Sequence, residues 1–442
     1  MNGLHVQYLI IGGGLAGSSA AQAIRKLDPR GELMMVGQEN VRPYHRPPLS
    51  KNYLRNRRER KEVFVQPVGW FTENGIRLRT ATRASHLDTA RRIVSLDNGE
   101  EVSFDRLLLA TGISPAHLTI PGSDFPNIYY LRTLEDADRL HHAIDKAKAE
   151  GLKHNRGTPA VPGVGAPSGG ASAGSGRGRV AVIGGGVLGV ELAATLTQIG
   201  LGVDLMLSQA TPWPRFAGEH TGRFLTRYLE NHDVVVHASA RPQQLDGDGR
   251  VQRVVIDAER TVACDFVVAA VGATLNRDLL RGTPITAEKA ILVDDHCRTN
   301  VEGIFAAGDC AAVFDPLFGK HRVLDHWDNA AVTGALAGAN MAGGDLAYDA
   351  VNHFFSDVFD LTLLGWGEAR QVDRRLIRGN TTIESPDFLE LGIASDGRIA
   401  QVLAINHTGE DELLRDLVAR RVRVDGQEEA LKDPAFPLAS LL

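Results

Sequence analysis

Two short glycine runs carry the residues of this sequence that are best suited to binding a phosphate group. Both follow the spacing G-x-G-x-x-G: Gly12, Gly14 and Gly17 in the first run, and Gly184, Gly186 and Gly189 in the second. In such a run the first glycine permits a tight turn, the second lets the backbone approach a pyrophosphate, and the third lets a helix pack closely on a strand. The N-terminus of that helix offers free N–H groups and a partial positive charge. The pattern therefore predicts two dinucleotide sites.

Each run lies where a buried strand is expected to give way to a helix. Apolar residues 8–11 precede the first run, and alanine-rich residues 18–24 follow it. Residues 179–183 and 190–196 flank the second run in the same way. Short apolar segments bounded by glycine are typical of buried parallel strands. An internal repeat of this kind indicates two cofactors in one chain, one of which passes electrons to the other.

The strand after each glycine run predicts which side chain meets the adenosine ribose, because an acid near its end usually accepts hydrogen bonds from the ribose. After the predicted strand 32–36 the nearest acid is Glu39, and a solvated loop acid is the alternative interpretation. The predicted strand 201–207 is followed by Ser208 and Gln209, without an acid. The choice between NADH and NADPH is therefore left open.

Composition excludes several classes of protein. The chain has 48 Lys and Arg against 54 Asp and Glu, and its net charge of −6 argues against a general affinity for nucleic acid. Its three cysteines, Cys264, Cys297 and Cys310, lack metal-ligand spacing, so we expect no metal site and a reducing compartment. No signal peptide is evident, and no apolar run approaches the roughly 18–20 residues that cross a bilayer. These features predict a cytoplasmic protein without a membrane span.

Other segments present side chains to the expected sites. Residues 42–51 are too rich in proline for a helix or a strand, which predicts a rigid loop that fixes Arg46 and Lys51. The basic run 55–61 is either a solvated face or a docking patch for an acidic partner. Residues 300–309 predict a strand that delivers Asp309 at its carboxyl end, where open α/β sheets bind ligands.

With these residues in view, the sequence resembles the FAD/NAD(P)-dependent pyridine nucleotide oxidoreductases, which include glutathione reductase. It is most similar to the branch that holds apoptosis-inducing factor and the ferredoxin reductases of oxygenase systems. Besides the glycine runs, the motifs that carry the resemblance are Pro43-Tyr-His-Arg-Pro-Pro-Leu-Ser-Lys51, Ala110-Thr-Gly112, Ala307-Gly-Asp309, Leu324-Asp-His-Trp-Asp-Asn-Ala330 and Phe354-Phe-Ser-Asp357.

The resemblance implies an α/β fold with two Rossmann-like dinucleotide-binding domains, as in glutathione reductase, and a C-terminal α+β interface domain. The FAD-binding domain would be discontinuous and comprise residues 1–130 and 263–345. The NAD(P)H-binding domain would span 131–262, with a flexible Gly/Pro/Ser linker at about 153–178. Residues 346–442 would form the C-terminal domain.

The resemblance also implies roles for single residues. Lys51 and Glu191 match a pair beside the isoalloxazine, where a lysine favours the negative charge of reduced flavin and a carboxylate offsets the burial of that cation. Trp327 matches an aromatic residue over the flavin edge, and a domain-interface tryptophan is the alternative. These three residues are the predicted catalytic residues. The implied cofactor-binding residues are Gly12, Gly14, Gly17, Glu39, Arg46, Lys51, Ala84, Thr111, Gly112, Gly184, Gly186, Gly189, Glu191, Gly272, Gly308, Asp309 and Trp327.

The implied function is that of an FAD-dependent NAD(P)H oxidoreductase. The first glycine run and Glu39 would hold the pyrophosphate and adenosine of FAD, while Arg46 would contact its flavin side and Asp309 its ribityl chain. The second run would hold NAD(P)H as the hydride donor. A ferredoxin or rubredoxin is the favoured electron acceptor. A redox-sensing binding protein like apoptosis-inducing factor and a quinone or small-molecule reductase are the alternatives, and a homodimer is left open. No cysteine precedes Cys264, which argues against a redox-active disulfide.

Overall fold

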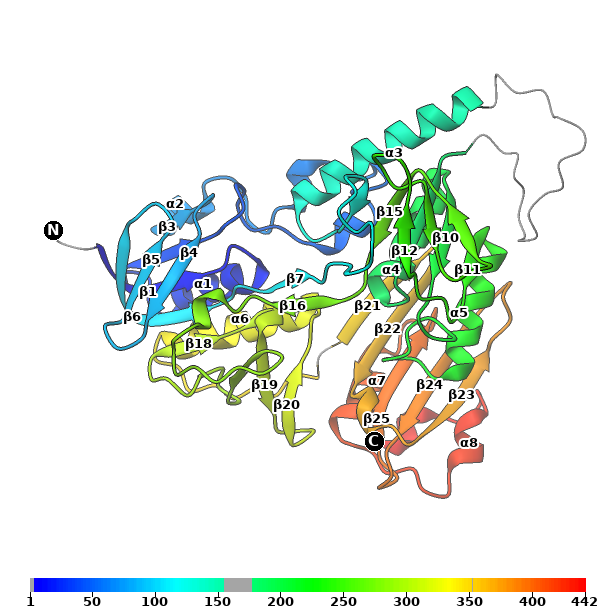
Figure 1. Ribbon diagram of the computed structural model, residues 1–442. Coiled ribbons are helices and arrows are strands. Elements are labelled where there is room, and N and C mark those ends of the chain that lie inside the picture. The colour runs from blue at the N-terminus through cyan, green and yellow to red at the C-terminus, as the bar shows by residue number, and fades with distance from the viewer. Residues whose placement is uncertain (1–3, 155–176, 352) are drawn as a thin grey trace, which may run out of the picture. The chain divides into compact units, whose positions relative to one another are not determined.

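The computed structural model describes residues 4–154, 177–351 and 353–442 (Figure 1). The chain forms two compact units, each assembled from separate segments. Unit 1 comprises Met1–Arg46, Glu59–Ser114 and Ala273–Phe354, and unit 2 comprises Pro47–Arg58, Pro115–Gly272 and Phe355–Leu442. Most of the linker predicted at about 153–178 lies outside the described residues.

Unit 1 is built on a seven-stranded sheet with the order β3-β2-β1-β6-β5-β4, in which β18 also pairs with β6. Strands β3, β2, β1, β6 and β18 pair in parallel, and β4, β5 and β6 form an antiparallel meander. The strands are β1 (Leu4–Ile11), β2 (Leu33–Val36), β3 (Ile76–Arg79), β4 (Ala84–Asp88), β5 (Ile93–Leu96), β6 (Glu101–Leu109) and β18 (Ile304–Ala306). Strand β2 is wholly apolar and buried, and β1 is buried from Tyr8 to Ile11, because the centre of a sheet that is covered on both faces buries its side chains. Near the start of β1, His5 is exposed.

Helices α1 and α6 lie side by side on this sheet (Figure 1). They approach closely because small residues face each other: a Cβ atom added at Gly334 would lie 2.3 Å from the carbonyl oxygen of Ala16, and one at Gly338 would lie 2.4 Å from that of Ala20. The other elements of unit 1 are η2 (Arg60–Val63), α2 (Trp70–Glu73), η3 (Asp278–Leu280), β17 (Ile291–Val293), η4 (Gly308–Cys310), β19 (Ala311–Asp315) and β20 (Lys320–Val323), with α1 at Leu15–Leu27 and α6 at Trp327–Met341.

Unit 2 contains a second parallel sheet, with the order β11-β10-β9-β15-β8, and a small antiparallel sheet, β12-β13-β14. The elements are β8 (Ile128–Tyr129), α3 (Leu134–His154), β9 (Arg179–Ile183), α4 (Val187–Ile199), β10 (Gly202–Met206), α5 (Glu219–Asn231), β11 (Val234–His237), β12 (Gln244–Asp246), β13 (Arg253–Val255), β14 (Thr261–Ala263) and β15 (Phe266–Ala269). The sequence of elements in unit 1, in which strand β1 is followed by a glycine joint and helix α1, occurs again in unit 2 as β9, a glycine joint and α4.

The C-terminal part of unit 2 is a five-stranded sheet with the order β21-β22-β25-β24-β23, drawn in orange in Figure 1. Glu390 of β24 is buried and accepts hydrogen bonds from the Gly218 N–H (2.9 Å) and from the Thr221 hydroxyl (2.6 Å) at the start of α5. This carboxylate caps α5 in place of a side chain on Gly218. The elements are β21 (His353–Val358), β22 (Leu361–Gly367), η5 (Ala369–Gln371), β23 (Arg374–Asn380), β24 (Asp387–Ile393), β25 (Ile399–Ile405), α7 (Asp411–Ala419), α8 (Glu428–Lys432) and η6 (Leu438–Leu441).

The predicted α/β fold class is confirmed, with two Rossmann-like sheets of mainly parallel strands and a separate C-terminal sheet. One local prediction is wrong, because the proline-rich loop contains a short 3₁₀ helix, η1 (Pro47–Ser50). The φ angle that proline imposes also suits a 3₁₀ helix. Two further short strands, β7 (Ile113–Pro115) and β16 (Ala273–Leu275), pair where the chain passes between the units.

Among the helices in the described part of the chain, none combines the length and the apolar character needed to cross a membrane.

The contact between α1 and α6 predicts a strong effect of a single methyl group. Gly338→Ala should lower the free energy of unfolding by about 1–3 kcal/mol, because the new Cβ atom cannot avoid the Ala20 backbone. Urea denaturation would measure this loss. Ala335→Ser adds one atom to a half-exposed position of the same helix and should change stability by less than about 0.5 kcal/mol. Equal stability of the two variants would contradict the proposed contact.

Candidate functional site

The joint between β1 and α1 in unit 1 has no room for side chains at two of its three glycines. Gly12 has a φ of 136°, and a Cβ atom there would lie 2.0 Å from the Ala110 carbonyl oxygen. A Cβ atom at Gly17 would lie 2.3 Å from the carbonyl oxygen of Gly12. Gly14, the N-cap of α1, would instead point a Cβ atom into open space, with no heavy atom within 4 Å. At Gly14, therefore, no side chain covers the first backbone N–H groups of α1.

The joint between β9 and α4 in unit 2 repeats this geometry. Gly184 has a φ of 132°, and its Cβ atom would lie 2.1 Å from the Ala270 carbonyl oxygen. The Cβ atom of Gly189 would lie 1.9 Å from the Gly184 carbonyl oxygen, and Gly186 again faces open space. Gly272 follows β15 at the same carboxyl edge of the sheet, since β9 and β15 are parallel. Two helix N-termini with an open backbone cradle are suited to two pyrophosphates.

Several predicted residues gather beside the first joint. A Cβ atom at Gly308 would lie 3.0 Å from the Cβ atom of Ala16, so η4 places Asp309 next to the start of α1. Thr111 and Gly112, which follow β6, donate hydrogen bonds toward the thiol of Cys310 in η4. The structure thus brings Thr111, Gly112, Gly308 and Asp309 to the carboxyl edge of the unit 1 sheet.

Ala84 lies elsewhere in unit 1. It opens β4, where it pairs with Leu96, and its side chain is buried in the sheet core. Its contact with a cofactor stays a prediction.

Glu39 and Arg46, to which the resemblance gives contacts with different parts of FAD, are joined in the structure. An Arg46 guanidinium nitrogen lies 2.8 Å from Glu39 Oε1, and the Tyr44 hydroxyl donates to Glu39 Oε2 at 2.6 Å. Burial by itself lowers the pKa of Arg46, but Tyr44, Glu39 and Asp309 outweigh burial and raise it. Sequence reasoning missed Tyr44, although it stands in the proline-rich motif. The separate contacts of Glu39 and Arg46 stay predictions.

Trp327 is held by a residue of the same motif. Its indole N–H donates to His45 Nδ1 at 3.0 Å, and the two rings lie 5.7 Å apart between centroids. The side chain is at the start of α6 and is 37% exposed. A ligand or a partner could therefore pack against one face of the indole ring. His45 is a further residue that sequence reasoning missed. The flavin contact of Trp327 stays a prediction.

Lys51 and Glu191 form a buried ion pair in unit 2. Lys51 Nζ lies 2.6 Å from Glu191 Oε1, and the side chains are 9% and 6% exposed. The Ser50 hydroxyl donates to Oε2 at 2.6 Å, and the Ser356 hydroxyl donates to Oε1 at 2.7 Å. Burial of a charge pair is tolerated only where the remaining lone pairs are also hydrogen-bonded, and the two serines provide this. The structure brings the predicted pair together, and its place beside the flavin stays a prediction.

The three cysteines are buried and free. Burial raises the pKa of Cys264 to about 12 and also raises the pKa of Cys297. Burial raises the pKa of Cys310 as well, although the hydrogen bonds from Gly112 and Thr111 oppose this effect. A thiol must ionise to act as a nucleophile, so all three are poorly suited to thiol–disulfide exchange.

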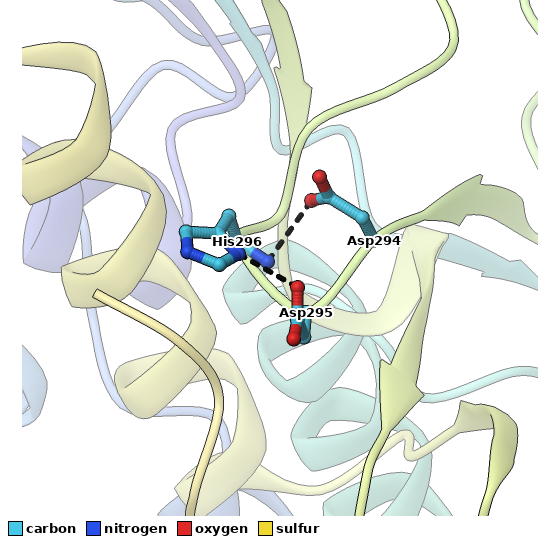
Figure 2. Close-up of side chains that lie close together, drawn as sticks. All are labelled: Asp294, Asp295 and His296. Carbon is cyan, nitrogen blue, oxygen red and sulfur yellow. Dashed lines mark hydrogen bonds and ion pairs between the residues drawn. The ribbon is translucent and has the colours of Figure 1, made fainter. Parts of the chain in front are cut away.

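A cluster of Asp294, Asp295 and His296 follows β17 in unit 1. The Asp294 carboxylate accepts a hydrogen bond from the backbone N–H of His296 (2.9 Å), and His296 Nδ1 lies 2.6 Å from Asp295 Oδ1 (Figure 2). Asp294 also accepts from the backbone N–H of Arg298 at 2.8 Å. These contacts order the turn that ends β17.

Comparison with protein families decides where the chain belongs. Residues 6–334 match the family model described as "Pyridine nucleotide-disulphide oxidoreductase", which is more than half of the chain. The chain belongs to the pyridine nucleotide-disulphide oxidoreductase family. Residues 353–442 match the model described as "Reductase C-terminal". The resemblance found in the sequence is thereby confirmed.

Relatives within this family are similar over most of their length. The chain is 29% identical over 435 residues to the anthranilate 1,2-dioxygenase system ferredoxin–NAD(+) reductase component of Burkholderia cepacia, covering 98% of this chain and 99% of the relative. It is 27% identical over 378 residues to a rubredoxin-NAD(+) reductase of Pseudomonas putida, covering 85% and 90%.

Solved structures of other reductases have the same fold. The ferredoxin reductase for the CYP199A2 system from Rhodopseudomonas palustris has a TM-score of 0.86 and 25% identity, covering 98% of this chain and 99% of that chain. The reductase chain in a covalent putidaredoxin reductase–putidaredoxin complex also has a TM-score of 0.86, with 24% identity and coverage of 99% and 98%.

The glycines of the second joint give a matched test of a pyrophosphate cradle. Gly186→Ala should leave the unfolding midpoint nearly unchanged, because its Cβ atom meets no protein atom, but should weaken NADH binding by about tenfold or more. Gly189→Ala should instead destabilise the protein, because its Cβ atom would collide with Gly184. Thermal unfolding without dinucleotide and calorimetric titration with NADH separate the two effects. Unchanged NADH affinity in Gly186→Ala would argue against a cradle at this joint.

Proposed function

We propose that this protein is an FAD-dependent NAD(P)H oxidoreductase that passes electrons to a ferredoxin- or rubredoxin-type protein. The observation that carries the proposal is the strand-to-helix joint that occurs twice in the chain. At Gly14 and at Gly186 no side chain covers the backbone at the N-terminus of the helix. Two such cradles suit two dinucleotides, one resident and one exchanging. The family match and the relatives' names support the same assignment.

The residues of the first joint fit FAD. The N–H groups at the start of α1 would hold the pyrophosphate, and Asp309 would accept a hydrogen bond from a hydroxyl of the ribityl chain. When bound, FAD supplies a ring that accepts a hydride and then releases electrons to an acceptor. Glu39 and Arg46 would bind as the ion pair described above, and Trp327 would cover one edge of the ring.

Unit 2 would bind the hydride donor and tune the charge around the ring. The second joint would hold the pyrophosphate of NAD(P)H, with Gly272 at the same sheet edge. The Lys51 ammonium would stabilise negative charge on the reduced ring, and Glu191 would keep that ammonium charged and in place. No side chain needs to move a proton in the hydride step, so positioning of the two rings is the main contribution of the protein.

The domain division proposed is that of the family. Residues 1–130 and 263–345 would bind FAD, residues 131–262 would bind NAD(P)H, and residues 346–442 would form the C-terminal domain. We also place the protein in the cytoplasm, where NADH is available and where buried thiols such as Cys310 stay reduced.

The electron acceptor is proposed from two observations. Relatives are named as ferredoxin and rubredoxin reductases. In addition, Arg57, Arg58, Arg60 and Lys61 of the basic run are exposed, which favours an acidic partner. Exposed charges of this kind act mainly on the rate of association and are screened by salt.

The function is tested by anaerobic reduction. The FAD-loaded protein should bleach near 450 nm within seconds on addition of NADH or NADPH, and the comparison of the two donors gives the coenzyme preference. The reduced protein should then reoxidise rapidly with a ferredoxin or a rubredoxin at low salt and more slowly at high salt. Reoxidation only by a quinone would favour the small-molecule reductase. A change of elution volume on reduction, without rapid reoxidation by any acceptor, would favour the redox-sensing binding protein.

The role of the buried cation is tested by its removal. Lys51→Met keeps the length of the side chain but removes the charge, and should slow flavin reduction by NADH by about 10- to 100-fold, equivalent to about 1.4–2.8 kcal/mol. The control is Lys432→Met, which removes the cation of an exposed pair with Glu429 on α8 and should leave the rate unchanged. Equal rates in the two variants, with FAD bound in both, would contradict the proposed role of Lys51.

A further inference from the structure

The carboxylate of Glu191 is held by three donors from two segments that are far apart in the sequence. Oε1 accepts from Lys51 Nζ (2.6 Å) and from the Ser356 hydroxyl (2.7 Å), and Oε2 accepts from the Ser50 hydroxyl (2.6 Å). All four residues are buried, and Ser356 has no exposed surface. The carboxylate therefore has one defined orientation.

Helix α4 forms hydrogen bonds with Ser50 at two points. Glu191 and Thr195 are four residues apart and so lie on one face of the helix. Glu191 accepts from the Ser50 side chain, while the Thr195 hydroxyl donates to the Ser50 carbonyl oxygen at 2.7 Å. This double contact fixes the backbone immediately before Lys51. The position of the ammonium is therefore set from its own loop and from α4.

Ser356 contributes from the C-terminal part of the chain. It belongs to β21, where its neighbour Phe355 has its ring centroid 5.2 Å from Lys51 Nζ. The Ser356 hydroxyl and the Lys51 ammonium share Oε1, so the hydroxyl lowers the negative charge that the carboxylate presents there. Without the hydroxyl, Oε1 would keep only Lys51, and the carboxylate could rotate and draw the ammonium with it.

We propose that Ser356 is a positioning residue, which sets the orientation of Glu191 and through it the charge that Lys51 presents to the cofactor. The inference rests on the proposed function and deepens it. It assigns the C-terminal segment a part in tuning the cofactor, in addition to any contact with an acceptor. The residue acts on the reaction only through Glu191.

The first test removes the hydroxyl and restores it. Ser356→Ala should slow flavin reduction by NADH by about tenfold and make the midpoint potential of bound FAD more negative, because the buried carboxylate loses one donor. Ser356→Thr keeps a hydroxyl at the same position of a strand and should recover most of both effects. Stopped-flow absorbance gives the rate, and dye-coupled titration gives the potential.

The matched control is Thr221→Val. Thr221 also donates from a buried hydroxyl to a buried carboxylate, that of Glu390, at 2.6 Å and in the same unit. Its loss should lower the unfolding midpoint about as much as Ser356→Ala does, but should leave the potential and the rate unchanged. If both variants shift the potential equally, the effect of Ser356 is one of general stability and the proposal is wrong.

A double variant tests whether Ser356 acts through Glu191. In Glu191→Gln the charge is already absent, so adding Ser356→Ala should change the rate by less than about twofold. A further tenfold loss in the double variant would overturn the proposal. A protein that binds no FAD, or that neither NADH nor NADPH reduces, would contradict the proposed function itself. A reducible holoprotein in which Ser356→Ala matches the unaltered chain would contradict only this inference.

Discussion

The close approach of backbone to backbone at the two strand-to-helix joints is the constraint on which the rest of the structure depends. At each joint the first glycine lies against the end of the neighbouring parallel strand, which is Ala110 in unit 1 and Ala270 in unit 2. In both cases the N–H of that alanine donates to the last residue of the central strand, Ile11 or Ile183, at 2.8 Å. A side chain at the joint would separate these strands. The open cradle at Gly14 and at Gly186 is therefore a consequence of sheet packing as much as of ligand binding.

The packing of unit 1 extends this constraint across the sheet. Because Gly334 and Gly338 let α6 approach α1, the first turn of α1 is pressed against η4 near Ala16. The N–H of Gly308 donates to the Thr333 hydroxyl on α6 at 2.9 Å, which ties the turn that carries Asp309 to the same helix. The position of Asp309 is thus fixed by small residues and one hydroxyl, and these have no chemistry of their own.

The sequence was sufficient for features that depend on local spacing. The glycine runs predict both joints because each glycine has a steric reason that involves its immediate neighbours, and the pair of Lys51 and Glu191 follows from two motifs of the family. Ser356 could not be found in this way, since a serine in a strand has many alternative partners and its contact with Glu191 depends on tertiary packing. The same holds for the ion pair of Glu39 and Arg46, because it depends on the conformation of the loop between them.

The proline-rich loop shows a different limit. Its prolines exclude an α-helix and a strand, but a φ angle near −65° is shared by loops and 3₁₀ helices, so the sequence could not distinguish them. The turn at Pro47–Ser50 matters because it orients Ser50 and Lys51 toward α4.

The burial of the thiols bears on how electrons leave the protein. The family is named for disulphide chemistry, which needs a thiolate close to the flavin. Cys310 stands next to Asp309, yet its sulfur donates to the carbonyl oxygens of Leu109 (3.4 Å) and Ala307 (3.3 Å), and burial raises its pKa. Held in this way, the thiol fills space beneath the turn. In contrast to this buried thiol, the indole of Trp327 is half-exposed and is fixed by its hydrogen bond to His45, so it can meet an external partner.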